Sequence, residues 1–219
     1  MMIGSFVQTP PPGKSLAKLS SPGPYHTTLL SQSVGRHRDV SRKGCLHAQV
    51  ELDTTNGQQI VDITHDILNT LETWQPVVSN NRLDGILTVS SMHTTCAIVV
   101  NENEHYLKED ILEYVHHVVP RDGPQEKGYG HNVLEKRPAT DRDREAIVRN
   151  NYGGFSSVEE FMSQEPINAH AHIQAMLLGN SVTVGVEDGH LRLGSWQSIM
   201  FVELDGPRKQ RKAALTLVY

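Results

Sequence analysis

The sequence is poor in several residue types, and each shortage excludes a class of protein. Only 2 of the 219 residues are cysteine, and Cys45 and Cys96 lie far apart, outside any Cys-x-x-Cys spacing. A disulfide framework is therefore not expected, and a reducing compartment is the simpler assumption. The chain also lacks a run of about 18 apolar residues, so the sequence predicts no membrane span and no membrane partner.

Positive charge is scarce as well. Lysine and arginine together number 20, against 25 acidic residues, which gives a net charge of −5 at pH 7. Affinity for nucleic acids comes largely from clustered lysine and arginine on phosphates. The chain has no RNP, zinc-finger or basic-helix pattern either. We therefore expect no nucleic-acid partner.

Familiar catalytic signatures are missing too. The chain has no Gly-x-Ser-x-Gly elbow, no His-Glu-x-x-His, no Walker loop and no Gly-x-Gly-x-x-Gly. This removes the direct assignments to a serine hydrolase, a zincin, an NTPase or a Rossmann enzyme. The chain does carry 12 histidines. The ordinary role of each one is a hydrogen-bonded structural residue, so each must be judged from its neighbours.

The first 43 residues differ in composition from the rest. They are rich in proline, serine and glycine, and they carry six basic residues against one acid, Asp39. Such a segment buries too little apolar surface to offset the entropy of ordering, which predicts a disordered tail over residues 1–43. A basic, acid-poor segment is also typical of organelle transit peptides. We expect a cytoplasmic protein, with organelle targeting by this tail as the alternative.

Residues 44–219 show the patterns of a single α+β domain with a largely antiparallel mixed sheet and two to three helices. Alternation and β-forming runs predict strands, while apolar residues at helical spacing predict helices. The strands are expected at about 45–52, 85–91, 96–100, 181–186, 191–193, 199–204 and 213–218. The helices are expected at about 58–73, 107–120 and 169–178.

A charged insertion at about 135–165 interrupts this domain. It contains a dense charge cluster over residues 141–145, and Ser157 with Glu160 has the spacing of a helix capping box. The sequence therefore predicts one short helix at 157–162 within a segment that is otherwise a surface loop. Connections of this length are either functional or mobile, so a flap over a site is the alternative interpretation.

Polar residues mark the candidate site. His93-Thr94-Thr95 interrupts two apolar strands, and such a local conflict tends to mark a functional position. Asn168 is a suitable N-cap of the third helix, with Gly179 placed to end it in the left-handed αL conformation. Asn168 and His172 share one face of this helix, because residues four apart are neighbours, whereas His170 points elsewhere.

Three imidazoles from separate segments, His93, His131 and His172, would make the ligand set of an open zinc site. A metal held there would lower the pKa of its bound water or polarise a phosphoryl oxygen. The candidates for catalysis are His93 itself, Glu102 and Asp110, the two acids serving as base or as supporting partners of the ligands.

Three further residues have both an ordinary and a functional interpretation. Trp196 is either a core indole or a substrate contact, and Gln197 is either a surface amide or a substrate contact. Arg208 lies in a turn, where it is either solvated or in contact with an anion.

Several motifs together resemble the YjbQ-type family, which is often labelled secondary thiamine-phosphate synthase. The resemblance covers Gly44 to the C-terminus apart from the insertion, and it depends on six weak motifs in register rather than on any one of them. The motifs are His93-Thr94-Thr95, Asn101-Glu102-Asn103-Glu104, Tyr129-Gly130-His131-Asn132, Asn168-Ala169-His170-Ala171-His172 with Leu178-Gly179-Asn180-Ser181, Gly189-His190-Leu191-Arg192-Leu193-Gly194-Ser195-Trp196-Gln197 and Asp205-Gly206-Pro207-Arg208.

The resemblance implies an α+β fold, a homotrimer with a site at the subunit interface, and a divalent metal, expected to be zinc, on His93, His131 and His172. The implied activity is weak thiamine-phosphate synthesis, which joins a hydroxymethylpyrimidine diphosphate to a thiazole phosphate. The partner is thus a small phosphorylated molecule. The expected substrate-binding residues are Thr94, Thr95, Asn168, Trp196, Gln197 and Arg208.

Two other functions stay open beside the transferase. One is a metal- or ligand-binding trimer without efficient turnover, and the other is a metal-dependent phosphohydrolase. The long tail and the charged insertion depart from the family pattern, and the insertion follows His131 directly, so it bears on the class of substrate.

Overall fold

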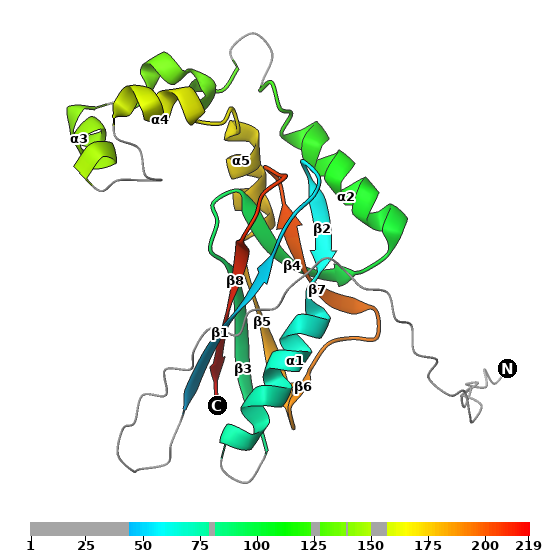
Figure 1. Ribbon diagram of the computed structural model, residues 1–219. Helices are drawn as coiled ribbons and strands as arrows, with labels where there is room; N and C mark the ends of the chain where they lie inside the picture. The colour runs from blue at the N-terminus through cyan, green and yellow to red at the C-terminus, as the bar shows by residue number, and fades with distance from the viewer. Residues whose placement is uncertain (1–43, 79–81, 124–127, 139, 150–156) are drawn as a thin grey trace, which may run out of the picture.

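The computed structural model describes residues 44–78, 82–123, 128–138, 140–149 and 157–219, and the predicted disordered tail lies outside them. The chain forms two sheets flanked by helices, which confirms the α+β class (Figure 1). The strands are β1 Cys45–Leu52, β2 Gln59–Asp62, β3 Gly85–Ser91, β4 Cys96–Glu102, β5 Ser181–Glu187, β6 His190–Leu191, β7 Gln197–Glu203 and β8 Arg211–Val218. The α-helices are α1 Thr64–Trp74, α2 His105–Val118, α3 Asp141–Arg149, α4 Val158–Gln164 and α5 Ala169–Leu178.

Both sheets are antiparallel. The larger one has the strand order β1-β8-β3-β5-β6, and the smaller one has the order β2-β7-β4. The predicted alternation of β1 is confirmed, because Leu46, Val50 and Leu52 are buried while Cys45 and His47 are exposed. One face of the large sheet therefore packs on the core and the other face is open.

Helix α1 covers the core side of the sheets. Its side chains Ile67, Leu71 and Trp74 are at most 2% exposed, and the helix contacts β1, β6 and β7. Burial of each such side chain stabilises the fold by about 1.5–3 kcal/mol. Helix α1 therefore holds strands of both sheets together at this end of the molecule.

The start of the predicted helix 58–73 is wrong, because its first residues form β2. Ile60 and Val61 pair with Val202 and Phe201 of β7, and the helix begins only after the strand ends. The side chain of Asp62 accepts a hydrogen bond from the backbone N–H of Thr64 at 2.8 Å, which supports the first turn. A strand of four residues is too short for its period of two to outweigh the helical spacing that follows it.

The charged insertion contains more helix than the sequence predicts. Helix α3 forms over the charge cluster expected to be a loop, and Arg149 pairs with Glu145 four residues earlier at 2.9 Å. The predicted cap of α4 is confirmed, since Ser157 Oγ accepts from the N–H of Glu160 at 3.1 Å. We call α3 and α4 the helical arm, and Figure 1 shows it standing beyond α5, away from the sheets.

Helix α5 links the small sheet to α2. Its bounds match the prediction, and Ala171 and Ala175 pack in a small apolar cluster with Ala97 of β4 and Val202 of β7. The fully buried Gln174 donates to the carbonyl of Val119 at 2.9 Å, which ties α5 to the end of α2. Among the helices of the described residues, none is long and apolar enough to cross a membrane.

Candidate functional site

The start of α5 does not have the cap that the sequence predicts. Asn168 occupies the N-cap position, but its side chain does not cap the helix, and its Nδ2 donates to Oδ2 of Asp205 at 2.8 Å. The cap comes instead from Asn132, whose Oδ1 accepts from the N–H of Ala169 at 3.0 Å. The side-chain amide of Asn168 therefore does not cap the helix, and it points instead towards Asp205, just after the end of β7. After the helix, Gly179 has the expected positive φ of 91°, but its ψ of 144° lies outside αL.

Three buried polar atoms around this helix start have no hydrogen-bond partner among the described residues. They are His131 Nε2, Asn168 Oδ1 and His170 Nδ1. His131 also lies against His172, with ring centroids 5.0 Å apart and ring planes at 70°. Buried polar atoms without partners are rare, and each indicates a ligand, an ordered water or an ion. We call His131, Asn168, His170 and His172 the α5 cluster.

Burial favours the neutral state of two rings in the α5 cluster, those of His131 and His170. Burial lowers the pKa of His131, and the charge of Arg137 and the ring of His172 lower it further. Burial also lowers the pKa of His170, with Arg121 adding to the effect. Since the ordinary pKa of histidine is about 6.5, both rings are mainly neutral at pH 7. A neutral imidazole is the form that binds a metal or accepts a proton.

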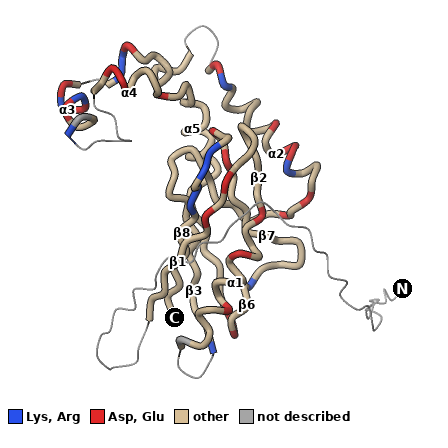
Figure 2. The backbone as a smooth tube through the Cα atoms, viewed as in Figure 1, with Lys and Arg blue, Asp and Glu red and all other residues tan. Residues whose placement is uncertain are grey.

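A fixed cation lies beside the cluster. Arg208 donates through NH2 to the Asp205 carboxylate at 2.8 Å and through Nε to the Asp205 carbonyl at 2.9 Å. Thr54 Oγ1 accepts from the backbone N–H of Arg208 at 2.8 Å, which fixes the turn itself. Asp205 is therefore the shared acceptor of Asn168 and Arg208. Figure 2 shows basic positions close to acidic ones where β7 ends and β8 begins.

A second polar group lies beneath this turn, and it is complete. Glu203 is 0% exposed and accepts from Arg211 Nε at 2.6 Å and from Arg211 NH2 at 3.0 Å. The same carboxylate accepts from the N–H groups of Leu204 and Asp205 at 3.0 and 2.9 Å. Arg211 NH2 also donates to Thr95 Oγ1 at 3.2 Å. We call Glu203, Arg211 and Thr95 the Glu203 network.

The structure brings together two of the three predicted metal ligands, and the third has another role. His93 Nε2 accepts a hydrogen bond from the backbone N–H of Lys212 at 2.9 Å, so that atom is engaged. His131 and His172 meet in the α5 cluster. Within the described part of the chain, no three His, Cys, Asp or Glu side chains form a group that could hold a metal ion. The three-histidine site stays a prediction.

Other predicted site residues lie at the opposite end of β7. Gln197 pairs with Glu102 of β4, whereas Glu203 at the other end pairs with Cys96. Six strand steps separate the two ends, which is about 20 Å. Trp196 is 76% exposed, so it is not a core indole, and the Gln197 side chain accepts from its neighbouring turn. These residues do not meet the α5 cluster within one chain.

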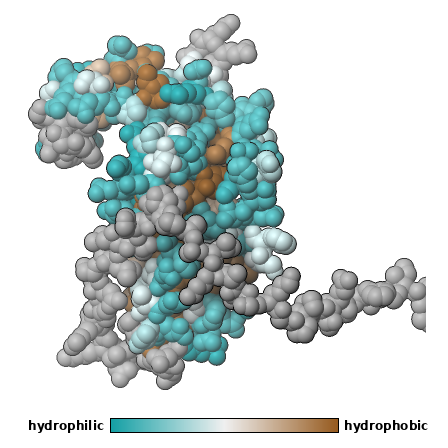
Figure 3. All heavy atoms as spheres, turned by 45° about the vertical axis from the view of Figure 1, so that its right-hand side comes forward, coloured by the Kyte–Doolittle hydropathy of each residue, from teal (hydrophilic) through white to brown (hydrophobic). Residues whose placement is uncertain are grey.

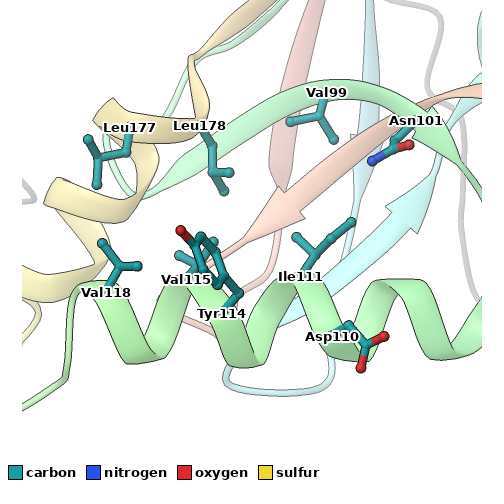
Figure 4. Close-up of a pocket in the computed structure, with 9 residues that line it drawn as sticks. All are labelled: Val99, Asn101, Asp110, Ile111, Tyr114, Val115, Val118, Leu177 and Leu178. Atoms are coloured by element: carbon teal, nitrogen blue, oxygen red, sulfur yellow. The ribbon is translucent and has the colours of Figure 1, made fainter.

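The predicted base Asp110 lies on α2 beside an apolar groove rather than near the histidines. Figure 4 shows this groove of about 480 Å³ between α2, β4 and the end of α5, and Figure 3 shows apolar surface on the same side of the molecule. Its walls are mainly Ile111, Val115, Leu177 and Leu178. Asp110 itself is exposed and points away from the strands.

The sequence analysis missed several residues around the site. Arg137 donates to Glu165 at 2.7 Å and to the carbonyl of His131 at 3.1 Å, and it therefore joins the two ends of the insertion to the cluster. Arg211 was missed because the other buried positions of β8, Ala213, Leu215 and Leu217, are apolar. A charged residue in that position could have indicated a buried ion pair. Asp205 is part of a motif in the sequence, but its pattern gives no partner.

Comparison with known proteins identifies relatives for most of the chain. The family model described as UPF0047 protein YjbQ-like matches residues 48–219. A UPF0047 protein of Archaeoglobus fulgidus is 36% identical over 74% of this chain and 94% of its own length. One of Methanothermobacter thermautotrophicus is 35% identical over 74% of this chain and 85% of its own length.

Solved structures agree with this result. A protein of Sulfolobus solfataricus described as YbjQ-like and of unknown function gives a TM-score of 0.59 at 26% identity, covering 81% of this chain and 99% of that one. A YjbQ/UPF0047 protein of Clostridium acetobutylicum gives 0.52 at 30% identity, covering 77% and 98%. The chain therefore belongs to the YjbQ-like UPF0047 family.

Proposed function

We propose that the α5 cluster, with Asp205 and Arg208, is the site of a metal-assisted transferase for phosphorylated small molecules, with thiamine-phosphate synthesis as its reaction. The observation that carries the proposal is that two buried polar atoms, His131 Nε2 and Asn168 Oδ1, make no well-formed hydrogen bond beside the ring of His172, although the Asn168 side chain is close enough to oppose the lowering of the His131 pKa. Leaving such atoms unpaired costs about 1–3 kcal/mol each, a cost that a bound ligand offsets.

The donor set of the cluster fits a divalent metal in part. His131 and His172 would hold the ion, since the two rings are adjacent and Nε2 of His131 is unpartnered. Zinc is the expected ion, because imidazole is among its preferred ligands. His93 does not fit through Nε2, which the N–H of Lys212 occupies. A bound divalent ion would supply polarisation of a phosphoryl oxygen.

The remaining groups of the site suit a phosphorylated substrate. Arg208 is held by Asp205 and stays 42% exposed, so its guanidinium is fixed in place and still accessible. In the proposed reaction the diphosphate of the hydroxymethylpyrimidine leaves with increased negative charge. A fixed cation stabilises that charge without reorganisation. The amide of Asn168, held by Asp205, orients the ligand by accepting a hydrogen bond.

A second candidate function is a ligand-binding homotrimer without efficient turnover. It is favoured by the position of Trp196 and Gln197 at the far end of β7, about 20 Å away along the strand. If these two residues belong to the site, a neighbouring copy must supply them. In that case assembly, rather than catalysis, would be the property that the chain maintains.

Metal binding and thiamine synthesis test the proposal together. We would express the full chain in metal-replete medium, remove weakly held metal, and measure bound zinc for the wild type and for H131A, H172A and H65A. His65 is exposed on α1, so its variant is a matched control. The expected result is about one zinc per chain in the wild type and H65A, and loss in the other two.

The same variants are then placed in a thiamine-auxotrophic strain that lacks its own thiamine-phosphate synthase. The proposal expects growth with the wild type and H65A and none with H131A. Zinc binding without rescue by the wild type would overturn the transferase and leave the binding trimer. Rescue that persists in H131A would reject the site.

A further inference from the structure

The outer face of the large sheet carries a group of reactive side chains unrelated to the α5 cluster. In β1, Cys45 and His47 are two residues apart and therefore project on the same face, opposite the buried Leu46. His47 also lies directly across from Thr216 in the register of β1 with β8. The three polar side chains thus stand in a row on the open face.

The three side chains of this row lie within hydrogen-bond distance of one another in the order Cys45, His47, Thr216. Cys45 Sγ lies 3.3 Å from His47 Nε2, and His47 Nδ1 lies 3.2 Å from Thr216 Oγ1. When Nδ1 carries the proton and donates it to the Thr216 hydroxyl, Nε2 presents its lone pair to the thiol. A nucleophile within reach of a base that a third group orients is the usual arrangement of an activated nucleophile.

The second cysteine gives a contrast within the same chain. Cys96 is 0% exposed, and burial together with the neighbouring Glu203 raises the pKa of its thiol to about 12. Such a thiol stays protonated and shielded, and is therefore unreactive at neutral pH. Cys45 is exposed and has a base beside it. Native protein should thus have one reactive thiol rather than two.

We infer that Cys45, His47 and Thr216 form a thiol-exchange site, in which Cys45 reacts with low-molecular-weight disulfides, His47 accepts its proton and Thr216 positions His47. An open sheet face suits this chemistry, because the attacking sulfur needs only a clear approach along the disulfide bond. The inference does not depend on the proposed function, since the row lies on β1 and β8 while the cluster lies at the start of α5.

The step balances without a further reactant. The thiol proton of Cys45 passes to Nε2 of His47, and the thiolate attacks one sulfur of the disulfide. A bond forms between Cys45 Sγ and that sulfur while the original sulfur–sulfur bond breaks. The leaving thiolate takes the proton back from the imidazolium as a free thiol. The sulfur of Cys45 is oxidised from the thiol to the disulfide level, the leaving sulfur is reduced from the disulfide to the thiol level, and the third sulfur stays in a disulfide.

Thiol kinetics on the full-length protein test the inference. The probe is oxidised glutathione, and the mixed disulfide is followed by intact mass and located by peptide mass spectrometry. We expect one glutathione per native chain on Cys45, a normal rate in C96A, and none in C45S. H47A should react about tenfold more slowly at pH 7, and T216V should show a smaller decrease.

The pH dependence separates a proton acceptor from a bystander. The wild type and H47A should differ in the shape of their pH–rate profiles, because only the wild type has the His47 base beside the thiol. Circular dichroism and urea midpoints confirm that the surface variants stay folded. Equal rates in the wild type and H47A would overturn the inference, as would a native Cys45 that does not react.

Discussion

Two buried polar groups meet near the end of β7, and they differ in how far they are completed. In the Glu203 network, the carboxylate accepts from Arg211 and from two backbone N–H groups, and the guanidinium also reaches Thr95. In the α5 cluster, His131 and Asn168 each keep a buried atom without a partner among the described residues. Asp205 connects the two groups, since its backbone N–H donates to Glu203 while its carboxylate accepts from Asn168.

This difference gives the two groups different roles, one in stability and one in binding. A carboxylate and a guanidinium that satisfy each other define one geometry, so the Glu203 network fixes the turns that carry Thr95 and Asp205. An unsatisfied group lowers stability and persists where binding requires it. Stability should therefore depend on the Glu203 network, and ligand affinity should depend on the α5 cluster.

The largest expected effect is on the complete network. E203Q leaves Arg211 buried without its counter-charge, and we expect the free energy of unfolding to fall by about 3–5 kcal/mol in urea denaturation. The matched control is E187Q, which removes an exposed ion pair with Arg192 and should leave the midpoint unchanged. A loss below about 1 kcal/mol in E203Q would show that the network is not the scaffold.

A smaller effect, on the stability of the whole folded chain, is expected on acidification. The pKa values of His93, His131 and His170 are lowered, primarily by burial in each case. The unfolded chain then binds more protons than the folded chain below the ordinary pKa of about 6.5. The stability due to these groups is thus present above pH 6.5 and is lost as pH falls through the lowered values.

Urea midpoints measured from pH 8 to pH 5 should therefore decrease below about pH 6.5. The decrease should be shallower in H170N, which removes the most buried of the three rings. A midpoint that is constant over this range, or that rises on acidification, would contradict the assignment of neutral buried rings.

Substitution in the incomplete α5 cluster should have little effect on the stability of the fold. We expect H131A to change the free energy of unfolding by no more than about 1 kcal/mol, because the substitution removes no well-formed hydrogen bond of the ring atom Nε2. Its zinc affinity should fall at least about tenfold in calorimetric titration. If H131A costs as much stability as E203Q, the two groups have the same structural role and the contrast fails.

The smallest effect is expected in the helical arm. S157A removes the cap of α4, which is worth about 1 kcal/mol to the helix. Because the arm stands beyond the sheets, this loss should appear as faster amide exchange in α4 with an unchanged global midpoint. Faster exchange that extends into α5 would show that the arm and the site are coupled.

Much of the fold follows from periodicity in the sequence. β1, β3 and α5 were predicted to within a residue, β1 from its alternation, β3 from its β-forming residues and α5 from Asn168 and Gly179 at its two ends. β2 was missed because its four residues are defined by pairing with β7, which no local pattern reveals. Helix α3 was missed because its stabilising contacts are between charged residues rather than apolar ones.

The site was predicted in its elements but not in its contacts. The i, i+4 spacing predicted that Asn168 and His172 share one helix face, and in the structure both side chains lie beside His131, a proximity that the spacing does not predict. The cap of α5 comes from Asn132, 37 residues before Ala169, and no local pattern predicts it. Arg211 lies only eight residues after Glu203, but their pairing depends on the turn that brings the start of β8 back to the end of β7. The metal, the trimer and the reaction stay predictions that the experiments above address.

The position of β8 bears on how the chain comes together during synthesis. β8 lies between β1 and β3 in the large sheet, pairing Leu46 and Leu87 to the same residue, Leu217. Both of these strands leave the ribosome long before β8 does, so each has an unpaired inner edge until then. Such edges invite intermolecular pairing. Because β8 pairs with both strands, its addition covers the two inner edges together and closes the sheet from its middle.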